Sequence, residues 1–522
     1  MRYSIKIRLF ILVLLLFVAV SIYLKIISSS FSQFPVCKGC NIVFIDIDIL
    51  RADHLGCYGY HLNTSPNIDS LAAKSLIFED AFAQSPITFS SHMAILTSLY
   101  PSCSDVKYPE ADMLSTQVKT LNQILHENNY ETVVVAPKNA YQLSPSSGFN
   151  RGVSVTFDID QTEEALQFAR NIKSKPFFLS FYFADTHDPY FPTPEALNHF
   201  KEFVNLSNPL IMFDLGYYHD LAYVTLFENE GIMKDILNEK EFIRYKEYLN
   251  RVTELNNSLK SKIGVVMEFI NNVAEEPEKL GYAFVQMSYP LIRKYYFDRF
   301  NLSDRNDIEL IRTLYDATIY DTDILVGEIL SWLESNGYLN RTLIVITSDH
   351  GEDLFEHGFF GHFDINDETT HVPLIIYTPK IAHLRVKGIV ESIDIMPTLL
   401  GMVGIPMPVR IQGENLFTLI LNKRNISKKY AFSEVNDILS VRSSDWRLNL
   451  YENDSLQLLN VVNGSDNPVD VSGLHPLIVN QLKAVIEEWH KQNLQCPNKA
   501  TRVWRPGLPE RVKQNLIKTG YW

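Results

Sequence analysis

The sequence lacks an excess of basic residues, and this absence excludes one large class of partner. Its 47 lysines and arginines face 61 aspartates and glutamates, which gives a formal net charge of -14. A nucleic-acid backbone requires a basic surface, so we do not expect nucleic acid as a partner. An anionic small substrate is compatible with this charge, because a bound metal ion can invert the field of its own site.

Internal repeats and low-complexity tracts are also missing from the 522 residues, of which 46% are hydrophobic. A chain with this apolar content can bury a large core, which excludes an intrinsically disordered protein. The length suits one large α/β domain and a smaller appendage.

Cysteine is scarce for a secreted chain, with five residues, an odd number. Cys37 and Cys40 form a Cys-x-x-Cys, for which we expect a small disulfide rather than a redox motif, because no βαβ pattern precedes it. We expect Cys57, Cys103 and Cys496 to be buried or free.

A convincing small-x-small cleavage site is absent from the N-terminal region. Basic residues precede an apolar run from Leu9 to Leu24. This run is slightly short of the ~20 residues of a comfortable span but long for a signal-peptide core. We therefore expect residues 1–27 to form an uncleaved, single-pass membrane anchor, with everything after it outside the cytoplasm.

Two apolar, β-branched runs at 41–45 and 342–346 are expected to be buried strands. Asp48 follows the first, and Asp349 and His350 follow the second. Open α/β sheets place their ligands at the carboxyl ends of the strands. A carboxylate beside an imidazole makes half of a metal site, which needs oxygen donors from elsewhere. We predict that the fold brings these three residues together.

The remaining pattern predicts an α/β domain over residues 41–421, after a polar spacer at 28–40. Residues 194–312 are helical, charged and aromatic, and we expect an excursion that forms a lid or a wall over the site. From 422 to 522, short alternating segments and a helix predict a small antiparallel-sheet subdomain. Further strands of the main domain are expected at 132–136, 177–183 and 371–377.

Thr88 lies in a hydroxyl-rich segment that continues with a helical apolar pattern. The pattern places Thr88 at or near a helix N-terminus, an end that favours bound anions. Threonine is also a common N-cap, so a capping role for Thr88 is open. Asp46 faces the same side as Asp48 by strand alternation, and we expect a buried, hydrogen-bonded group there rather than a further ligand.

Taken together and in order, several motifs resemble those of the sulfatase family within the alkaline phosphatase superfamily. They are Asp48-x-Leu50-Arg51-Ala52-Asp53, Pro66-Asn67-Ile68-Asp69, the segment 88–101, Thr186-His187-Asp188-Pro189-Tyr190, Ser348-Asp349-His350-Gly351-Glu352 and Asp394-Ile395-Met396-Pro397-Thr398. The resemblance implies a doubly wound sheet with helices on both faces, a metal at the strand ends and a small C-terminal antiparallel sheet.

Carried over by residue, Asp48, Asp349 and His350 match metal ligands, and Thr88 matches the nucleophile, which also contacts the metal. The resemblance implies one divalent ion. A histidine ligand favours manganese or zinc, whereas the family favours calcium or magnesium, so all four stay open.

His187 and His362 fall where the family places groups that hold the ester oxygens or protonate the leaving group. Each also has a plainer interpretation. His187 precedes Asp188-Pro189 and would fix a turn, and His362 shares a glycine-rich loop with His357, where we expect one of the two to be structural.

The sequence departs from the family pattern at the residues that a formylglycine-dependent sulfatase needs. A sulfatase of the usual kind has cysteine or serine at the Thr88 position, in Cys/Ser-x-Pro-x-Arg, and oxidises it to formylglycine. Threonine is no substrate for that maturation, Ser90 replaces the proline and His92 the arginine. Ile49 stands where many sulfatases carry a second metal-binding aspartate.

The set of Asp48, Thr88 and the Asp349-His350 pair is similar to that of the superfamily's phosphotransferases, which use a threonine as the nucleophile. We therefore expect a metal-dependent hydrolase or transferase of phosphate or sulfate esters, with an anionic ester of a glycan or lipid as substrate. The alternatives are a sulfatase acting on glycans or lipids, and a degenerate sulfatase-like protein that binds such a ligand without turnover.

Overall fold

The structure is a computed structural model and describes residues 36–106, 112–137, 148–205, 208–211, 214–255, 258–275, 277–421, 428–462, 469–497 and 499–502. The expected membrane anchor at 1–27 and the start of the spacer lie outside these residues. Within the described ranges, no helix has both the length and the apolar character that a membrane crossing requires.

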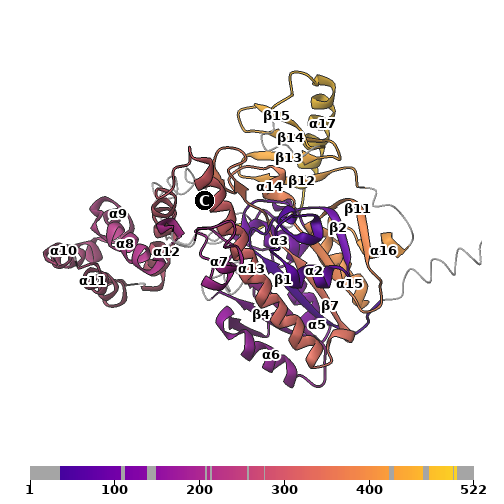
Figure 1. Cartoon of the computed structure of the whole chain (residues 1–522), viewed down its shortest axis with the longest axis horizontal. Coiled ribbons are helices and arrows are strands. Elements are labelled where there is room, and N and C mark those ends of the chain that lie inside the picture. Colours follow the sequence, from indigo (N-terminus) through magenta and orange to yellow (C-terminus); the bar gives the residue numbers. More distant parts are fainter. Residues whose placement is uncertain are drawn as a thin grey trace, which may run out of the picture.

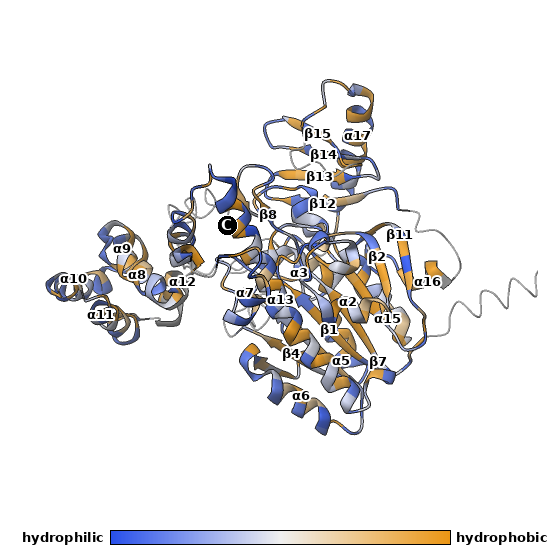
Figure 2. Ribbon diagram, in the orientation of Figure 1, coloured by the Kyte–Doolittle hydropathy of each residue, from blue (hydrophilic) through white to orange (hydrophobic). Residues whose placement is uncertain are grey.

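An eight-stranded sheet forms the centre of the molecule (Figure 1). Its order is β11, β2, β10, β7, β1, β6, β4 and β5, and every neighbouring pair is parallel except the two that β10 makes. The strands are β1 Asn41–Ile47, β2 Leu76–Phe82, β4 Glu131–Ala136, β5 Val155–Asp158, β6 Phe177–Phe183, β7 Thr342–Thr347, β10 Leu374–Tyr377 and β11 Leu384–Glu391. A sheet of this kind is covered on both faces, which explains its near-continuous apolar strands (Figure 2).

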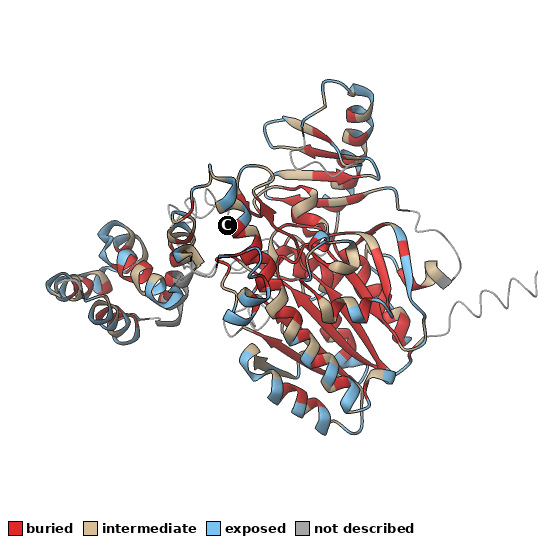
Figure 3. Cartoon of the chain, viewed as in Figure 1, coloured by how far each residue is buried: buried red, intermediate tan, exposed pale blue. Residues whose placement is uncertain are grey.

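Helices cover both faces of this sheet, and β1 shows why. Alternation sends Val43 and Ile45 into one apolar core, and Ile42 and Phe44 into another. The first core includes residues of α2 Pro66–Ala72, α6 Thr162–Asn171 and α13 Arg305–Ser335; the second includes residues of α5 Leu121–Glu127 and α15 Ile395–Val403. The strands are buried throughout the centre (Figure 3). The predicted doubly wound α/β fold is confirmed.

The chain between β6 and α13 is mostly helical. Its helices are α7 Pro194–His199, α8 Leu215–Glu228, α9 Glu230–Ile236, α10 Glu239–Glu254, α11 Leu259–Asn272 and α12 Pro277–Phe297. Helices α8 to α12 surround an apolar core of their own, with Phe227, Tyr245 and Phe269 at its centre. They project from the side of the sheet, and α12 leads back to it (Figure 1).

The C-terminal region holds a four-stranded antiparallel sheet, in the order β12, β13, β14 and β15. The strands are Ala431–Val435, Ile438–Arg442, Trp446–Leu450 and Leu456–Asn460, and α17 is Pro476–Leu494. Leu482 and Ile486 of α17 pack against Leu448 and Leu458 of the sheet. This is the small antiparallel sheet expected from the sequence.

The cysteines form two disulfides, Cys37–Cys40 and Cys103–Cys496. The first was expected. Cys103 is buried, as expected, but neither Cys103 nor Cys496 is free, because the tertiary fold pairs these two residues across 393 positions of sequence. Cys57 keeps its thiol, and burial raises the pKa of that thiol.

Two arginines of the C-terminal sheet bind one carboxylate of the central domain. Arg447 Nη2 lies 2.6 Å from Asp367 Oδ1, and Arg442 Nη2 lies 3.0 Å from Asp367 Oδ2. Asp367 begins the short helix α14, Asp367–Thr370. Burial alone would raise the pKa of Asp367, but the two guanidinium groups outweigh it and hold that pKa well below its ordinary value.

Replacing Asp367 with asparagine should lower the free energy of unfolding by about 2 kcal/mol at pH 7, because two guanidinium groups lose a charged acceptor. Since the folded-state pKa is depressed, this contribution is present above the ordinary carboxyl pKa of about 4 and is lost as the pH falls below it. Chemical denaturation of both chains at pH 7 and pH 3 measures the difference. An equal difference at the two pH values would contradict the charge argument.

Candidate active site

Strand pairing explains how Asp48 meets Asp349 and His350. β1 and β7 are parallel neighbours, with Asp46 opposite Thr347, so residues just beyond the two strand ends lie side by side. Ligand atoms of Asp48, Asp349 and His350 lie within 4.8 Å of one another, and all three residues are buried. The structure thus brings together the three residues that the strand patterns pointed to.

Each of the two carboxylates keeps one open oxygen. Asp48 Oδ1 and Asp349 Oδ2 are buried and have no hydrogen-bond partner within the described part of the chain. They lie 3.8 and 3.5 Å from His350 Nε2. His350 Nδ1 lies 2.9 Å from Gly351 O, so a neutral ring donates there and presents the lone pair of Nε2 to the carboxylates.

The electrostatics of this cluster suit a cation. Burial and then the charge of Asp349 raise the pKa of Asp48, and burial raises the pKa of Asp349 to about 6. Burial also lowers the pKa of His350 to about 3, which keeps the ring neutral. Two buried carboxylates and a neutral imidazole, with lone pairs converging, are a donor set that fits a divalent metal ion.

Thr88 is the first residue of α3, Thr88–Thr97. Its Oγ1 lies 3.1 Å from His350 Nε2, which places the hydroxyl at the edge of the Asp48, Asp349 and His350 cluster. The N-cap position belongs to Ile87, so Thr88 does not cap this helix. The fold therefore leaves the Thr88 hydroxyl directed at the cluster.

Beneath the cluster, His92 of α3 binds Asp46 of β1. His92 Nε2 lies 2.7 Å from Asp46 Oδ2, and both side chains are buried. Burial would lower the pKa of His92, but the Asp46 carboxylate outweighs it and raises that pKa to about 9. Asp46 is buried and hydrogen-bonded, as expected.

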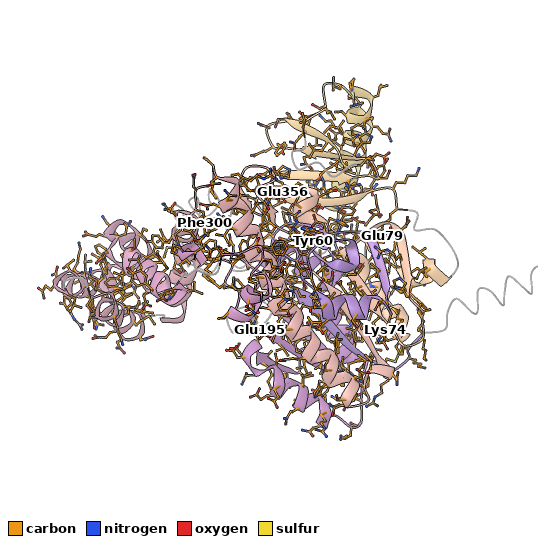
Figure 4. The ribbon with its side chains drawn as sticks, viewed as in Figure 1. Tyr60, Lys74, Glu79, Glu195, Phe300 and Glu356 are labelled. Carbon is orange, nitrogen blue, oxygen red and sulfur yellow. A yellow bond between two sulfur atoms is a disulfide. The ribbon has the colours of Figure 1, made fainter. Side chains whose placement is uncertain are left out.

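The loop after β1 has an unusual backbone conformation at Ile49 and is hydrogen-bonded to the loop after β7 through Arg51. Ile49 has φ of +49°, a conformation that β-branched residues rarely adopt, and its side chain is buried in an apolar core. Residue 49 therefore adds no side-chain ligand. Arg51 Nη1 donates to Glu352 O at 3.1 Å and to Glu356 Oε1 at 2.8 Å, which ties this loop to the loop after β7. Glu356 is labelled near the middle of the molecule in Figure 4.

Two imidazoles, those of His362 and His187, lie outward from His350 of the cluster. The ring centroids of His350 and His362 are 4.6 Å apart, and those of His362 and His187 are 5.4 Å apart. His362 Nδ1 lies 3.0 Å from Glu352 Oε2, and His187 Nδ1 lies 2.9 Å from Asp188 O. The structure therefore places both predicted histidines beside the site, each with an oxygen atom within 3.0 Å of its Nδ1.

The two outer histidines differ in charge. Burial opposes protonation of His187, but the hydrogen bond to Asp188 and the charge of Asp48 outweigh it and raise its pKa to about 10. Burial and then the neighbouring His187 lower the pKa of His362 to about 3. His187 is therefore the protonated member of the pair at neutral pH.

Helix α12 of the excursion reaches the site. Arg293 Nε donates to Asp188 Oδ2 at 2.6 Å, and the Tyr289 hydroxyl donates to Asp188 O at 2.8 Å and lies 3.0 Å from His187 Nδ1. The turn that carries His187 is thus held from the excursion side.

Sequence reasoning assigned no role to Glu352, which orients His362, or to Tyr182, whose hydroxyl donates to Asp48 Oδ2 at 2.6 Å. A signal for Tyr182 exists: it carries a hydroxyl in an otherwise phenylalanine-rich buried strand, Phe177–Phe183, and a buried tyrosine hydroxyl usually needs a partner. The roles of Tyr289 and Arg293 had no such signal, because they lie more than 100 residues from the turn they hold.

The chain is similar to known proteins of one family. The model of the Sulfatase family matches residues 40–405, and the model described as N-sulphoglucosamine sulphohydrolase, C-terminal, matches residues 355–492. Similar curated proteins include N-acetylglucosamine-6-O-sulfatase of Bacteroides thetaiotaomicron and iduronate 2-sulfatase of Homo sapiens. Each is 24% identical to this chain; the first alignment covers 74% of this chain and 72% of the relative, the second 76% and 75%.

Solved structures share the fold. One of them, a protein in complex with its substrate D-glucosamine-2-N,6-O-disulfate, superposes with a TM-score of 0.62 at 21% identity, over 88% of this chain and 99% of that one. With a family model that spans most of the chain, this protein belongs to the sulfatase family and is an ester hydrolase of that family.

Proposed function

We propose that this enzyme is a membrane-anchored, extracytoplasmic hydrolase or transferase that cleaves phosphate or sulfate esters through Thr88. The observation that carries the proposal is the position of Thr88 Oγ1, 3.1 Å from His350 Nε2 at the edge of the Asp48 and Asp349 cluster. A hydroxyl placed beside a cation-binding cluster, with imidazoles on the outer side, is an arrangement suited to nucleophilic attack on an anionic ester.

Asp48, Asp349, His350 and the Thr88 hydroxyl would hold one divalent ion, which we take to be manganese, zinc, calcium or magnesium. An ion at this position would lower the pKa of a neighbouring hydroxyl and neutralise charge on the ester oxygens. The open oxygens of the two buried carboxylates support this assignment.

The first step transfers the phosphoryl or sulfuryl group to the protein. Thr88 loses its proton to solvent, a bond forms between Oγ1 and phosphorus or sulfur, and the bond to the leaving oxygen breaks. His187 donates a proton to that leaving oxygen. Its side chain is 22% exposed against 8% for His362, so a leaving group can reach it, and its Nδ1 is already held by Asp188.

The second step removes the group from Thr88. Water, or an acceptor alcohol in a transferase, attacks the adduct, and the bond to Oγ1 breaks as phosphate, sulfate or a new ester leaves. The neutral His187 takes the proton of the attacking hydroxyl, and Thr88 regains a proton from solvent.

Phosphate chemistry suits this residue better than sulfate chemistry. A formylglycine hydrate releases sulfate by breaking its own carbon–oxygen bond, which a second hydroxyl on the same carbon drives. Threonine has no second hydroxyl, so a sulfated Thr88 needs direct attack at sulfur. A phosphorylated Thr88 is resolved by in-line attack at phosphorus.

Hydrolysis of a sulfate ester is the second candidate, and the relatives favour it. Two of them are sulfatases by name, aligned over most of their length, and one is named for a 6-O-sulfated N-acetylglucosamine. These names support a sulfated sugar as the alternative substrate class, with a lipid ester as a further option.

Mass spectrometry of the purified chain tests the proposal. A phosphate ester and a sulfate ester are supplied in separate incubations, because the two adducts have almost the same mass, and the Thr88 peptide is analysed after each. We expect an adduct after the phosphate ester that is absent from Thr88→Val. No adduct, with no turnover of either ester in several metals, would refute the enzyme mechanism and favour a protein that only binds the ester.

The location is proposed from two features. The sequence predicts an anchor at 1–27, and the described residues contain two disulfides, which persist in oxidising compartments. Alkylation of the chain in intact cells, without prior reduction, tests this location; labelling of Cys103 and Cys496 would contradict it.

A further inference from the structure

Strand β6 places a tyrosine hydroxyl on a carboxylate of the cluster. Tyr182 is the register partner of Asp46, so its side chain lies on the side of the sheet from which Asp48 emerges. The hydroxyl donates to Asp48 Oδ2 at 2.6 Å. Both residues are buried, at 7% and 2% exposure, so this hydrogen bond does not compete with bulk water.

The backbone of Asp48 is also hydrogen-bonded. Its backbone N–H donates to Phe183 O at 2.9 Å, and the Thr186 hydroxyl donates to its carbonyl at 2.5 Å. The ring of Tyr182 packs edge-on against His92 at a centroid distance of 4.9 Å, and His92 is bound in turn to Asp46. Asp48 is thus held at its backbone and at one carboxylate oxygen, and the ring that holds this oxygen packs against His92.

Both carboxylates of the cluster have one occupied and one open oxygen. Asp349 Oδ1 accepts from the backbone of His350 at 2.9 Å and from that of Ile49 at 3.4 Å, while Oδ2 is open. Asp48 Oδ2 accepts from Tyr182, while Oδ1 is open. Backbone donors survive substitution of their side chains by any residue except proline, so Tyr182 is where this arrangement can be altered.

We propose that Tyr182 is a positioning residue that occupies Asp48 Oδ2 and makes Asp48 bind the metal through Oδ1 alone. The inference rests on the proposed function, in that it assumes a divalent ion at this cluster. It goes beyond the ligand set, because it assigns one particular oxygen and the residue that enforces it.

Restricting Asp48 to one oxygen bears on which metal is bound. Calcium accepts carboxylates through one or two oxygens and takes six to eight ligands, whereas smaller ions require fewer ligands at shorter distances. Removing the Tyr182 hydroxyl frees Oδ2 as a second ligand atom, which suits calcium, and it also loosens Asp48, which weakens binding of every ion. The ratio of affinities should therefore shift toward calcium.

The test compares Tyr182→Phe with the wild-type full-length chain by titration calorimetry with Mn²⁺ and, separately, with Ca²⁺. We expect the affinity for Mn²⁺ to fall by about 10- to 100-fold, the range typical for loss of a group that orients a ligand, and the affinity for Ca²⁺ to fall less. Tyr130→Phe is the matched control. It also loses a buried hydroxyl hydrogen bond, to Cys40 O at 2.9 Å, but far from the cluster, and it should keep both affinities.

Two outcomes overturn the inference in distinguishable ways. If the wild-type chain binds metal and Tyr182→Phe binds each ion as tightly as the wild type does, the positioning role is wrong while the proposed function stands. If the wild-type chain binds neither ion, the metal site itself is wrong. Circular dichroism of Tyr182→Phe and Tyr130→Phe shows whether both variants are folded, so that a loss of affinity is not mistaken for a loss of structure.

Discussion

Replacing Thr88 with valine should reduce turnover of the substrate ester by about a thousandfold or more, the scale on which loss of a nucleophile acts. Valine keeps the branched shape of threonine and removes only Oγ1, the atom that lies 3.1 Å from His350 Nε2. Thr88→Ser keeps a hydroxyl at the same place and should retain turnover within about tenfold. Steady-state kinetics on the three chains measures both effects.

The control for Thr88→Val lies in the same helix. Thr97 is buried near the end of α3, where its hydroxyl donates to Met93 O at 2.6 Å, so Thr97→Val removes a hydroxyl from α3 without touching the cluster. Normal turnover in Thr97→Val, together with a large loss in Thr88→Val, would locate the effect at the nucleophile. Full turnover by Thr88→Val would show that another group attacks the ester.

Asp349→Asn should abolish metal-dependent turnover, and it should be more stable than the wild type without metal but less stable than the wild type with metal. Asp349 and Asp48 are buried beside each other, and the charge of Asp349 raises the pKa of Asp48. Without metal, removing one charge relieves this repulsion, so the metal-free variant should melt at a higher temperature than metal-free wild type. With metal, the wild type should be the more stable, since binding at 100 times Kd adds about 2.7 kcal/mol.

Thermal melts with chelator and with excess metal measure this reversal. Asp185→Asn is the control, because Asp185 follows the same sheet edge but is exposed and lies outside the cluster. It should keep turnover and show the same metal-dependent rise in melting temperature as the wild type. If Asp349→Asn gained as much from metal as the wild type, Asp349 would not be a ligand.

Much of the fold was readable from local patterns. The runs before Asp48 and Asp349 are buried β1 and β7, and the alternating segments after residue 430 form the C-terminal sheet. Strands such as β2 and β11 were not predicted. β11 lies at the edge of the sheet and begins with exposed residues, so it lacks the continuous apolar run of a central strand.

The site also contains some residues that local patterns predict and others that only the packing of separate elements brings in. Asp48, Asp349 and His350 stand directly after strands, so the rule for parallel sheets was enough to predict that they meet. Tyr182, Glu352 and the contacts of α12 with His187 depend on how separate elements pack, and no local pattern encodes them.

The sequence alone therefore indicated the family and predicted that Asp48, Asp349 and His350 would meet, because both depend on residue type and on spacing within short segments. Only the tertiary structure decided which carboxylate oxygen is open, which histidine is protonated and which cysteines pair. Those properties come from burial and from contacts between residues as far as 393 positions apart, which strand register and helix packing create.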